Sequence, residues 1–385
     1  MQTVHTLYRP KQGWSQSLPA SLDGPDTLVL AFGARALIDD SGPLDALVAA
    51  FPRSVVMGCS SAGEIAAGEV GDDGISVVVT RFDSTRLHRA STPLTEAGDS
   101  EGAGARLAAA LPREGLRAVF MLANGVAVNG TALARGIGSA LPEGVVVSGG
   151  LAGDGSLFQR TWVLEQGKPN EHCVTAVGLY GEGLQVGHGC LGGWTEFGPE
   201  RVITRSDGNV LYELDGQPAL ALYKNYLGDL VGQLPGSALR FPLSVRAARN
   251  GSAPVVRTIL GIDEAAQSMT FAGDVPQGAI AQLMRTSTER LVASADQAAD
   301  RAMTEVGASD RRNSGPVLAV SVSCIGRRLV MGERTEEEVE AVVDRLPAGS
   351  AHAGFYSYGE IAPSNGCTLA DLHNQTMTLT VFAEN

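Results

Sequence analysis

A nine-residue stretch that occurs near both ends of the chain constrains the fold more than any other feature. Residues 58–66 read GCSSAGEIA and residues 354–362 read GFYSYGEIA, so six of the nine positions are identical. Each copy follows a helical pattern that ends in an apolar residue and a proline, at Phe51-Pro52 and at Leu346-Pro347. Such self-similarity indicates a duplicated structural unit. Equivalent residues of two pseudo-symmetric halves could therefore build one site.

The repeated unit is predicted to be a strand, a helix and a second strand. In the first copy, the apolar pattern predicts strands at 27–32 and 54–57 and a helix at 43–50. A weaker third copy is expected at 118–154, because its Ala-Gly-Asp ending resembles the Ala-Gly-Glu of residues 62–64. These patterns predict an α/β (mixed α+β) fold with two related domains, whose mixed β-sheets are flanked by helices.

The chain length bounds the number of domains. A chain of 385 residues is too long for one ordinary hydrophobic core and favours two domains. A hydrophobic content of 44% with 18% charged residues is typical of a globular protein. We place the boundary near Asp215-Gly216, which predicts an N-terminal extension at 1–26, a first domain at 27–216 and a second domain at 217–385.

Three segments carry further structural expectations. Alternating apolar residues and turn signals at 161–214 predict an antiparallel meander. Apolar residues on one face predict a single long helix at 279–303. The sequence Thr-Glu-Glu-Glu at 335–338 matches a capping box at the start of the next helix.

Charge and cysteine content exclude several partners and compartments. The formal net charge of −13, with no basic block, argues against a nucleic-acid partner. Five cysteines without a CxxC spacing fit a reducing compartment better than a disulfide framework. Neither a leader pattern nor an apolar run of about 18 residues is present. We therefore expect a cytoplasmic protein without membrane insertion.

The two repeated glutamates, Glu64 and Glu360, are the main candidates for chemistry. A carboxylate at the junction of a strand and a loop can accept hydrogen bonds from a ligand amine or from its own turn. The occurrence of two equivalent glutamates strengthens the ligand interpretation. Ser60 and Ser61 resemble a nucleophile elbow, but Ala62 occupies a position where that motif requires glycine. We therefore expect their hydroxyl groups to bind a ligand or to cap a helix.

Other single residues give weaker signals. Arg327, after the apolar strand that ends in Cys324, could clamp a carboxylate with two hydrogen bonds. The cysteine itself is more typical of a buried apolar side chain. His188, in a glycine-rich strand beside a thiol, and His352 are candidate axial ligands for a haem. Histidine spacing of the zinc-site type is absent from the sequence.

The chain resembles FIST proteins that contain both a FIST N and a FIST C domain. This resemblance covers the chain from about Leu28 onward, and it is carried by residues 58–66, 147–154, 193–198, 202–218, 323–327 and 354–363. It implies an intracellular sensory module proposed to bind small ligands such as amino acids. Stand-alone bacterial members are associated with histidine kinases or cyclic-di-GMP enzymes. The NosP-type subset has a similar two-domain layout and is haem-binding and nitric-oxide-responsive.

We therefore expect a small-ligand sensor without turnover, which relays occupancy to a separate histidine kinase or cyclic-di-GMP enzyme. A haem b variant that senses nitric oxide belongs to this expectation, with His188 as the candidate ligand. Two alternatives stay open: an enzyme that uses Glu64 and Glu360 as acid and base, and a scaffold with only a protein-binding face. The residues expected to line one pocket between the repeats are Ser60, Ser61, Glu64, Arg327, Tyr356, Tyr358 and Glu360, with Trp194 as an apolar wall.

Overall fold

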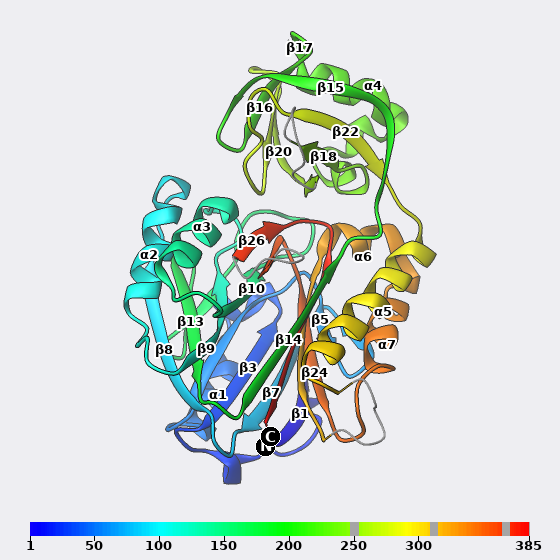
Figure 1. The fold of residues 1–385 in the computed structure, drawn as a ribbon. Coiled ribbons are helices and arrows are strands. Elements are labelled where there is room, and N and C mark those ends of the chain that lie inside the picture. Colours follow the sequence, from blue (N-terminus) through cyan, green and yellow to red (C-terminus); the bar gives the residue numbers. More distant parts are fainter. Residues whose placement is uncertain (247–253, 309–314, 364–369, 385) are drawn as a thin grey trace.

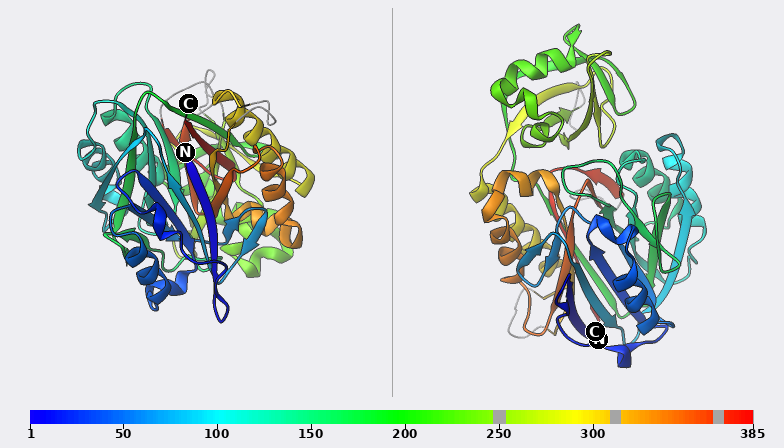
Figure 2. Two further views of the ribbon diagram at one scale, coloured as in Figure 1. Left: turned by 90° about the horizontal axis from the view of Figure 1, so that it is seen from below. Right: turned by 180° about the vertical axis from the view of Figure 1, so that it is seen from behind.

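The protein has a body of three mixed β-sheets and a small domain that stands above it (Figure 1). This computed structural model describes residues 1–246, 254–308, 315–363 and 370–384. The view from behind in Figure 2 shows the small domain set apart from the sheets of the body. The two parts also contact each other directly, since Arg257 donates to the carbonyl of Leu372 and Gln375 donates to the carbonyl of Leu239. The two termini lie together at the far end of the body, where the amino group of Met1 contacts Asp83.

Each sheet of the body contains one pair of parallel strands joined through helical segments. The first sheet has the order β12 (Lys168–Asn170), β11 (Val163–Glu165), β4 (Val55–Ser60), β3 (Thr27–Gly33), β7 (Ile75–Arg81), β1 (Gln2–Arg9) and β2 (Gly13–Trp14). The second has the order β26 (Ala370–His373), β25 (Gly359–Pro363), β10 (Val146–Leu151), β9 (Leu116–Ala123), β13 (Cys173–Tyr180) and β8 (Arg86–Pro93). The third has the order β14 (Leu184–Leu191), β27 (Met377–Glu384), β23 (Leu318–Cys324), β24 (Ala351–Ser357), β5 (Glu64–Ala66) and β6 (Glu69–Gly71).

The small domain is built on a fourth sheet that is inserted between β14 and the next helix of the body. Its order is β19 (Val255–Arg257), β18 (Leu243–Arg246), β22 (Ile280–Arg285), β15 (Thr195–Asp207), β16 (Val210–Leu214), β21 (Ser268–Phe271) and β20 (Ile259–Asp263), with β17 (Gln217–Pro218) beside β16. The predicted boundary at 216/217 falls between β16 and β17, so strands from both sides of it belong to this one sheet.

The three sheets exchange strands in a closed cycle. After its second parallel strand, each unit continues into the sheet of another unit: β5 pairs with β24, β11 pairs with β4, and β25 pairs with β10. Backbone hydrogen bonds fix these crossings, and they run from Ala62 to Tyr356, from Gly153 to Ser60 and from Tyr358 to Leu151 at 2.8, 3.1 and 3.1 Å. The turns that contain the repeated sequence therefore meet at the centre of the body.

Helices cover the outer faces of the sheets. They are α1 (Gly42–Ala50), α2 (Ser100–Ala109), α3 (Gly130–Ala140), α4 (Ala219–Leu227), α5 (Thr288–Glu305), α6 (Ile325–Met331) and α7 (Glu336–Val343). Helix α5 packs directly on β14 because glycines face its alanine-rich side. A Cβ atom at Gly187 or Gly189 would lie 2.0 or 1.9 Å from the carbonyl oxygens of Ala302 or Ala298.

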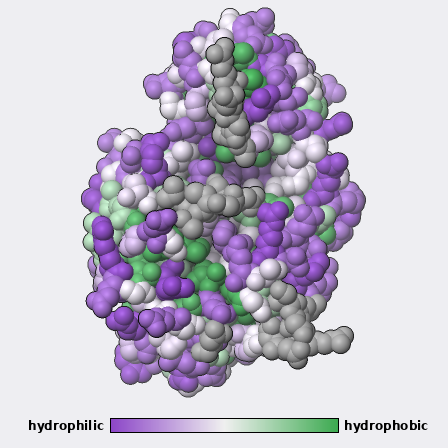
Figure 3. All heavy atoms as spheres, in the orientation of Figure 1, coloured by the Kyte–Doolittle hydropathy of each residue, from purple (hydrophilic) through white to green (hydrophobic). Residues whose placement is uncertain are grey.

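The main core lies between the inner faces of the three sheets. It includes Leu30 and Phe32 of β3, Phe120 of β9, and Val320 and Phe355 of the third sheet, all almost fully buried. Phe32 stacks on Phe355 with ring centroids 4.8 Å apart. Separate apolar clusters lie beneath the helices of each sheet and in the small domain. The outer surface in the view of Figure 3 is largely hydrophilic around α5 and α7.

The mixed α/β class, the sheets flanked by helices and the repeated strand–helix–strand units agree with the sequence analysis. The third copy is confirmed. In the second sheet, β9 and β10 are parallel neighbours joined through α3, just as β3 and β4 are parallel neighbours joined through α1 in the first sheet. All three units belong to the body, and the small domain is inserted between β14 and α5, ahead of the unit that begins with β23.

Three local predictions are wrong. Residues 280–285 of the expected long helix form β22, because Ala281 and Leu283 alternate into the core of the small domain and the helix starts at Thr288. The expected meander at 161–214 is distributed over all four sheets. The capping box does not form, since the hydroxyl of Thr335 donates to the carbonyl of Gly332 and Glu338 is buried in an ion pair.

Candidate functional site

A pocket of about 400 Å³ opens at the carboxyl ends of the parallel strands β3 and β4. Ligands of α/β proteins commonly bind in the crevice outside this end of the strands. The volume falls within the range of roughly 300–1,000 Å³ that is usual for small-molecule sites. The polar lining residues are Arg35, Asp39, Ser61, Asp72, Asp73 and Asp154. The pocket therefore combines one cation with four carboxylates.

Two of these carboxylates are already held by arginines from outside the lining. Asp72 accepts hydrogen bonds at 2.6 and 2.8 Å from Arg328, and these bonds lower the pKa of Asp72. Asp39 accepts a hydrogen bond at 2.7 Å from Arg160. Asp39 and Asp72 therefore form part of the wall of the pocket. Each would have to give up its bond to an arginine before it could bind a ligand.

Asp154 closes its own turn. Its carboxylate accepts hydrogen bonds from the backbone N–H groups of Phe158, Gln159 and Arg160 at 2.8, 3.0 and 2.8 Å. It also accepts one from the hydroxyl of Tyr358, whose ring stacks on Phe158 with centroids 4.4 Å apart. Tyr358 therefore supports the wall of the pocket from behind.

Arg35 and Asp73 are the charged residues that remain available to a ligand. The side chain of Arg35 is 34% exposed, and its Nε atom lies 3.9 Å from Asp154, which is too long for a hydrogen bond. Within the part of the chain that the structure describes, the carboxylate of Asp73 has no hydrogen-bond or ion-pair partner. Among the described residues, a cation held only by a loose ion pair with Asp154 and a carboxylate without a partner thus line the same cavity.

Ser61 is the one predicted ligand-binding residue in this lining. Its hydroxyl donates to Glu64 Oε1 at 2.8 Å and accepts from the N–H of Gly63 at 2.9 Å. The second carboxyl oxygen of Glu64 accepts from the N–H of Gly74 at 3.2 Å. Burial raises the pKa of Glu64 to about 8. Glu64 therefore stabilises its own turn through these hydrogen bonds, and its carboxyl group is largely protonated at neutral pH.

Glu360 has an equivalent structural role in the other copy. It accepts hydrogen bonds from the hydroxyl of Ser357 at 2.6 Å and from the hydroxyl and N–H of Thr376 at 2.8 and 3.1 Å. Burial raises its pKa to about 7. Among the described residues, the lining of the pocket includes neither Glu64 nor Glu360. The expected cavity shared by the two acidic turns is therefore a wrong prediction for this pocket.

Arg327 is a structural residue and is not a ligand clamp. Its side chain is fully buried and its five N–H groups donate to Glu338, to the hydroxyl of Ser294 and to the carbonyls of Gly192 and Leu291. A guanidinium has five N–H donors, so none is left for a ligand.

The remaining predicted residues also lie outside the pocket. The hydroxyl of Tyr356 donates to Glu338 at 2.7 Å, in the network around Arg327. Ser60 is buried, and its hydroxyl accepts from the N–H of Trp162 at 3.0 Å. The indole of Trp194 donates to the carbonyl of Gln375 at 2.9 Å and is not part of the lining.

The glycine-rich face of β14 leaves no room for a flat ligand. Helix α5 occupies the face on which Gly187 and Gly189 lie, whereas His188 between them points to the other face of the strand. The ring nitrogen Nδ1 of His188 lies 2.8 Å from Glu305. His352 is also unsuitable, because it is buried, hydrogen-bonds to Ser321 at 2.8 Å, and has a pKa lowered by burial to about 3. Across the described residues, no group of three or more metal-ligating side chains is present.

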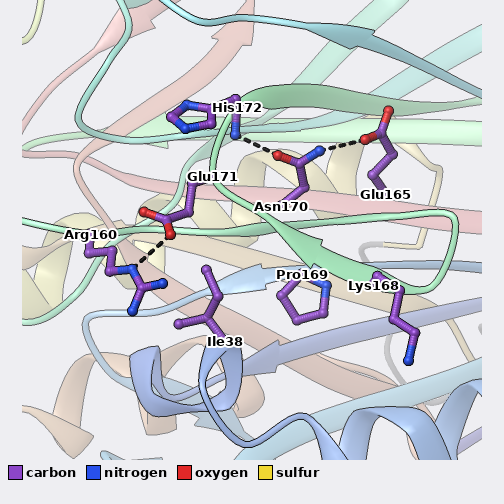
Figure 4. A pocket seen from close by; sticks show the side chains of 8 residues that line it. All are labelled: Ile38, Arg160, Glu165, Lys168, Pro169, Asn170, Glu171 and His172. Carbon is purple, nitrogen blue, oxygen red and sulfur yellow. Dashed lines mark hydrogen bonds and ion pairs between the residues drawn. The ribbon is translucent and has the colours of Figure 1, made fainter.

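A second pocket of about 350 Å³ adjoins the first (Figure 4). Arg160 and Glu171 face each other across it and form an ion pair at 2.7 Å, while Asn170 bridges His172 and Glu165. Because Arg160 also binds Asp39 of the first pocket, this arginine forms part of the wall between the two. Most of its charged groups are paired within the protein.

Together, these features define a mixed α/β protein of three repeated units with a pocket at the ends of the strands of the first unit. The chain belongs to the FIST family: the FIST N domain matches residues 27–217 and the FIST C domain matches residues 219–363. FIST domains are associated with sensory signal transduction and small-ligand binding. A search of curated proteins finds no match.

Some solved structures align with the chain at low similarity. A chorismatase covers 99% of this chain and 97% of its own at 11% identity, with a TM-score of 0.36. A cyanuric acid hydrolase covers 100% and 99% at 11% identity, with a TM-score of 0.31. The enzyme of that name from A. caulinodans covers 78% of this chain and 67% of its own at 12% identity, with a TM-score of 0.22. At these TM-scores the likeness carries no conclusion about this protein.

The sequence analysis missed Arg35 and Asp73 as site residues. A signal for Arg35 exists, because it directly follows the Gly33-Ala34 end of a buried strand. The pair Asp72-Asp73 before Gly74 reads as an ordinary turn between two strands. Only the three-dimensional meeting of β3, β4 and the β6–β7 loop distinguishes it from other acidic turns.

Proposed function

We propose that this protein is a sensory module that binds a small zwitterionic ligand in the pocket at β3 and β4. The single observation that carries the proposal is the presence of Arg35, which makes only a loose ion pair with Asp154, and of Asp73, which has no partner among the described residues, in one cavity at the ends of parallel strands. A guanidinium binds a carboxylate and a carboxylate binds an ammonium group. The ligand class that the FIST resemblance implies, amino acids, has both groups.

The relay of occupancy to a separate partner is part of this proposal. The pocket lies where the strand ends of the first unit meet the turn of the second unit at Asp154 and Gly155, and the adjoining Ala62 donates to the carbonyl of Tyr356 in the third unit. A ligand that binds one arrangement of these turns more tightly than another shifts their populations. The partner class implied by the family is a histidine kinase or a cyclic-di-GMP enzyme.

Two other functions are less well supported. Acid–base catalysis by Glu64 and Glu360 has in its favour that burial raises the pKa of both groups, but each carboxyl is satisfied inside its own turn. A scaffold without a ligand site does not account for the cavity at the junction of the units. Haem-based nitric oxide sensing through His188 is not part of this proposal, which uses the pocket at β3 and β4, and the Nδ1 atom of His188 lies 2.8 Å from Glu305.

The test is a calorimetric titration of the purified protein with each of the twenty common amino acids. We expect at least one to bind, and we expect Arg35→Gln and Asp73→Asn each to weaken it about tenfold or more, as for loss of one charge-assisted hydrogen bond. Arg81→Gln, which removes an exposed arginine at the far end of β7, is the matched control. Equal affinity in all three variants, or no binding amino acid, would contradict the proposal.

A further inference from the structure

A separate cavity of about 330 Å³ lies at one end of the second sheet. It is lined by Arg86, Leu87 and His88 of the edge strand β8, by Tyr180 of β13, and by Pro112 and Glu114 of the α2–β9 connection. None of these residues belongs to the pocket at β3 and β4. The inference drawn from this cavity is therefore independent of the proposed ligand sensing.

Strand register places three hydrogen-bond donors of this cavity on one face of the sheet. Tyr180 is opposite Arg86, and Gly178 is opposite His88. Side chains alternate between faces along a strand, so Arg86, His88 and Tyr180 share a face. The ring of Tyr180 lies over Gly178, because a Cβ atom there would be 2.6 Å from the phenolic oxygen. The hydroxyl is thus directed along the sheet toward the position of His88.

The hydroxyl of Tyr180 has an unmet hydrogen-bonding requirement. Tyr180 is only 3% exposed, and its hydroxyl has no hydrogen-bond partner in the structure. Burial raises the pKa of Tyr180 to about 12, so the group keeps its proton and is a donor at neutral pH. A buried polar atom without a partner costs free energy, and in folded proteins such atoms usually bind a ligand or water.

Arg86 and His88, the other two hydrogen-bond donors of the cavity, also have no partner among the described residues. In the described part of the chain, neither the guanidinium of Arg86 nor the imidazole of His88 forms a hydrogen bond or an ion pair with another residue. Charges on an edge strand often serve only to prevent sheets from associating. That role would explain Arg86 and His88, but it does not explain an unsatisfied hydroxyl buried beneath them.

We propose that this cavity binds the phosphate group of a small phosphorylated sugar or polyol. A phosphate accepts hydrogen bonds from several directions at once, which suits a cavity lined on one face of the sheet by a guanidinium, an imidazole and a phenol. Glu114 is the only carboxylate among the described lining residues. It repels the phosphate itself and is suited to accept a hydrogen bond from a hydroxyl group of the same ligand.

The proposal is tested by calorimetric titration with inorganic phosphate and with ribose 5-phosphate. We expect Arg86→Gln and Tyr180→Phe to weaken both ligands about tenfold, the loss of one strong hydrogen bond. Arg89→Gln removes the same charge from the opposite face of the same strand and is expected to bind as the unmodified protein does. Glu114→Gln is expected to tighten inorganic phosphate and to weaken ribose 5-phosphate relative to it.

Stability measurements separate a binding role from a structural one. Tyr180→Phe removes an unpaired buried hydroxyl, so its melting temperature without phosphate should equal or exceed that of the unmodified protein. A lower melting temperature would show that the hydroxyl already has a structural partner and would overturn the proposal. Affinity for phosphate that is equal in Arg86→Gln and Arg89→Gln, or matched by acetate, would overturn it as well.

Discussion

Glu64 offers the sharpest test of the interpretation that the repeated acidic turns are structural. Its carboxyl is 2% exposed, and burial raises its pKa from 4.5 to about 8. The folded protein therefore holds a proton between these values that the unfolded chain releases. Stability contributed by this proton is fully present below pH 4.5 and is lost as the pH rises to 8. The pKa of Glu64 in the folded protein is about 3.5 higher than its value of 4.5 in the unfolded chain. At 1.36 kcal/mol for each pKa unit, this difference corresponds to roughly 5 kcal/mol of unfolding free energy.

Substitution of Glu64 by glutamine should remove this pH dependence. The carboxyl of Glu64 accepts hydrogen bonds from the hydroxyl of Ser61 and from the N–H of Gly74. A glutamine can keep the second bond with its amide oxygen and donate from its NH2 group to the Ser61 hydroxyl, which then acts as an acceptor. We expect Glu64→Gln and the unmodified protein to be about equally stable at pH 4.5. At pH 9 the variant should be more stable by up to roughly 5 kcal/mol.

The assay is urea unfolding followed by the fluorescence of tryptophan, at several pH values between 4.5 and 9. The quantity of interest is the difference in unfolding free energy between Glu64→Gln and the unmodified protein at each pH. Glu69→Gln, at a glutamate whose side chain is 63% exposed, is the control for loss of a surface carboxylate. A difference that stays constant with pH would show that Glu64 is ionised in the folded protein and would refute the reasoning.

Three other perturbations have defined outcomes. Arg327→Met should lower stability by about 3–5 kcal/mol in thermal unfolding, because it leaves Glu338 buried without its cation; a change below 1 kcal/mol would contradict the structural role. Gly58→Ala should unfold at lower temperature, because its Cβ atom would lie 2.2 Å from the carbonyl of Ala31; wild-type stability would mean that the two strands are less closely packed. When haem is added, the unmodified protein and His188→Ala should give the same absorbance in the Soret region. A Soret band that is present in the unmodified protein and lost in His188→Ala would instead support haem binding by His188.

The sequence predicts the type of repeated unit but not how the units combine. Identity at 58–66 and 354–362 is sufficient to indicate duplication, and apolar runs locate β3, β9 and β23 closely. The exchange of strands is not visible, since nothing in residues 64–66 indicates pairing with β24, almost 290 residues away. Helix and strand periodicity are also difficult to distinguish in short apolar runs. For this reason the sequence predicts one continuous helix where the structure has β22 followed by α5.

The candidate site shows the same division between local and long-range information. The Ser-x-Gly-Glu turns are recognisable, yet whether a glutamate binds a ligand or its own serine depends on burial that sequence spacing does not reveal. Ser61 lies in the lining of the pocket, while Arg327 is held in the core by Glu338, a residue on a different helix. Arg35 and Asp73 are recognised as candidate binding residues only in the folded protein, where separate loops bring them into the lining of one pocket.

The cyclic strand exchange has a consequence for how the protein forms in the cell. The first unit to leave the ribosome places β5 in a sheet whose partner strand, β24, is synthesised near the end of the chain. Until then, β5 and the open edge of β10 lack the neighbours that they have in the finished molecule. Completion of the body must therefore wait for translation to finish, and fragments that end before β25 should expose edges that favour aggregation.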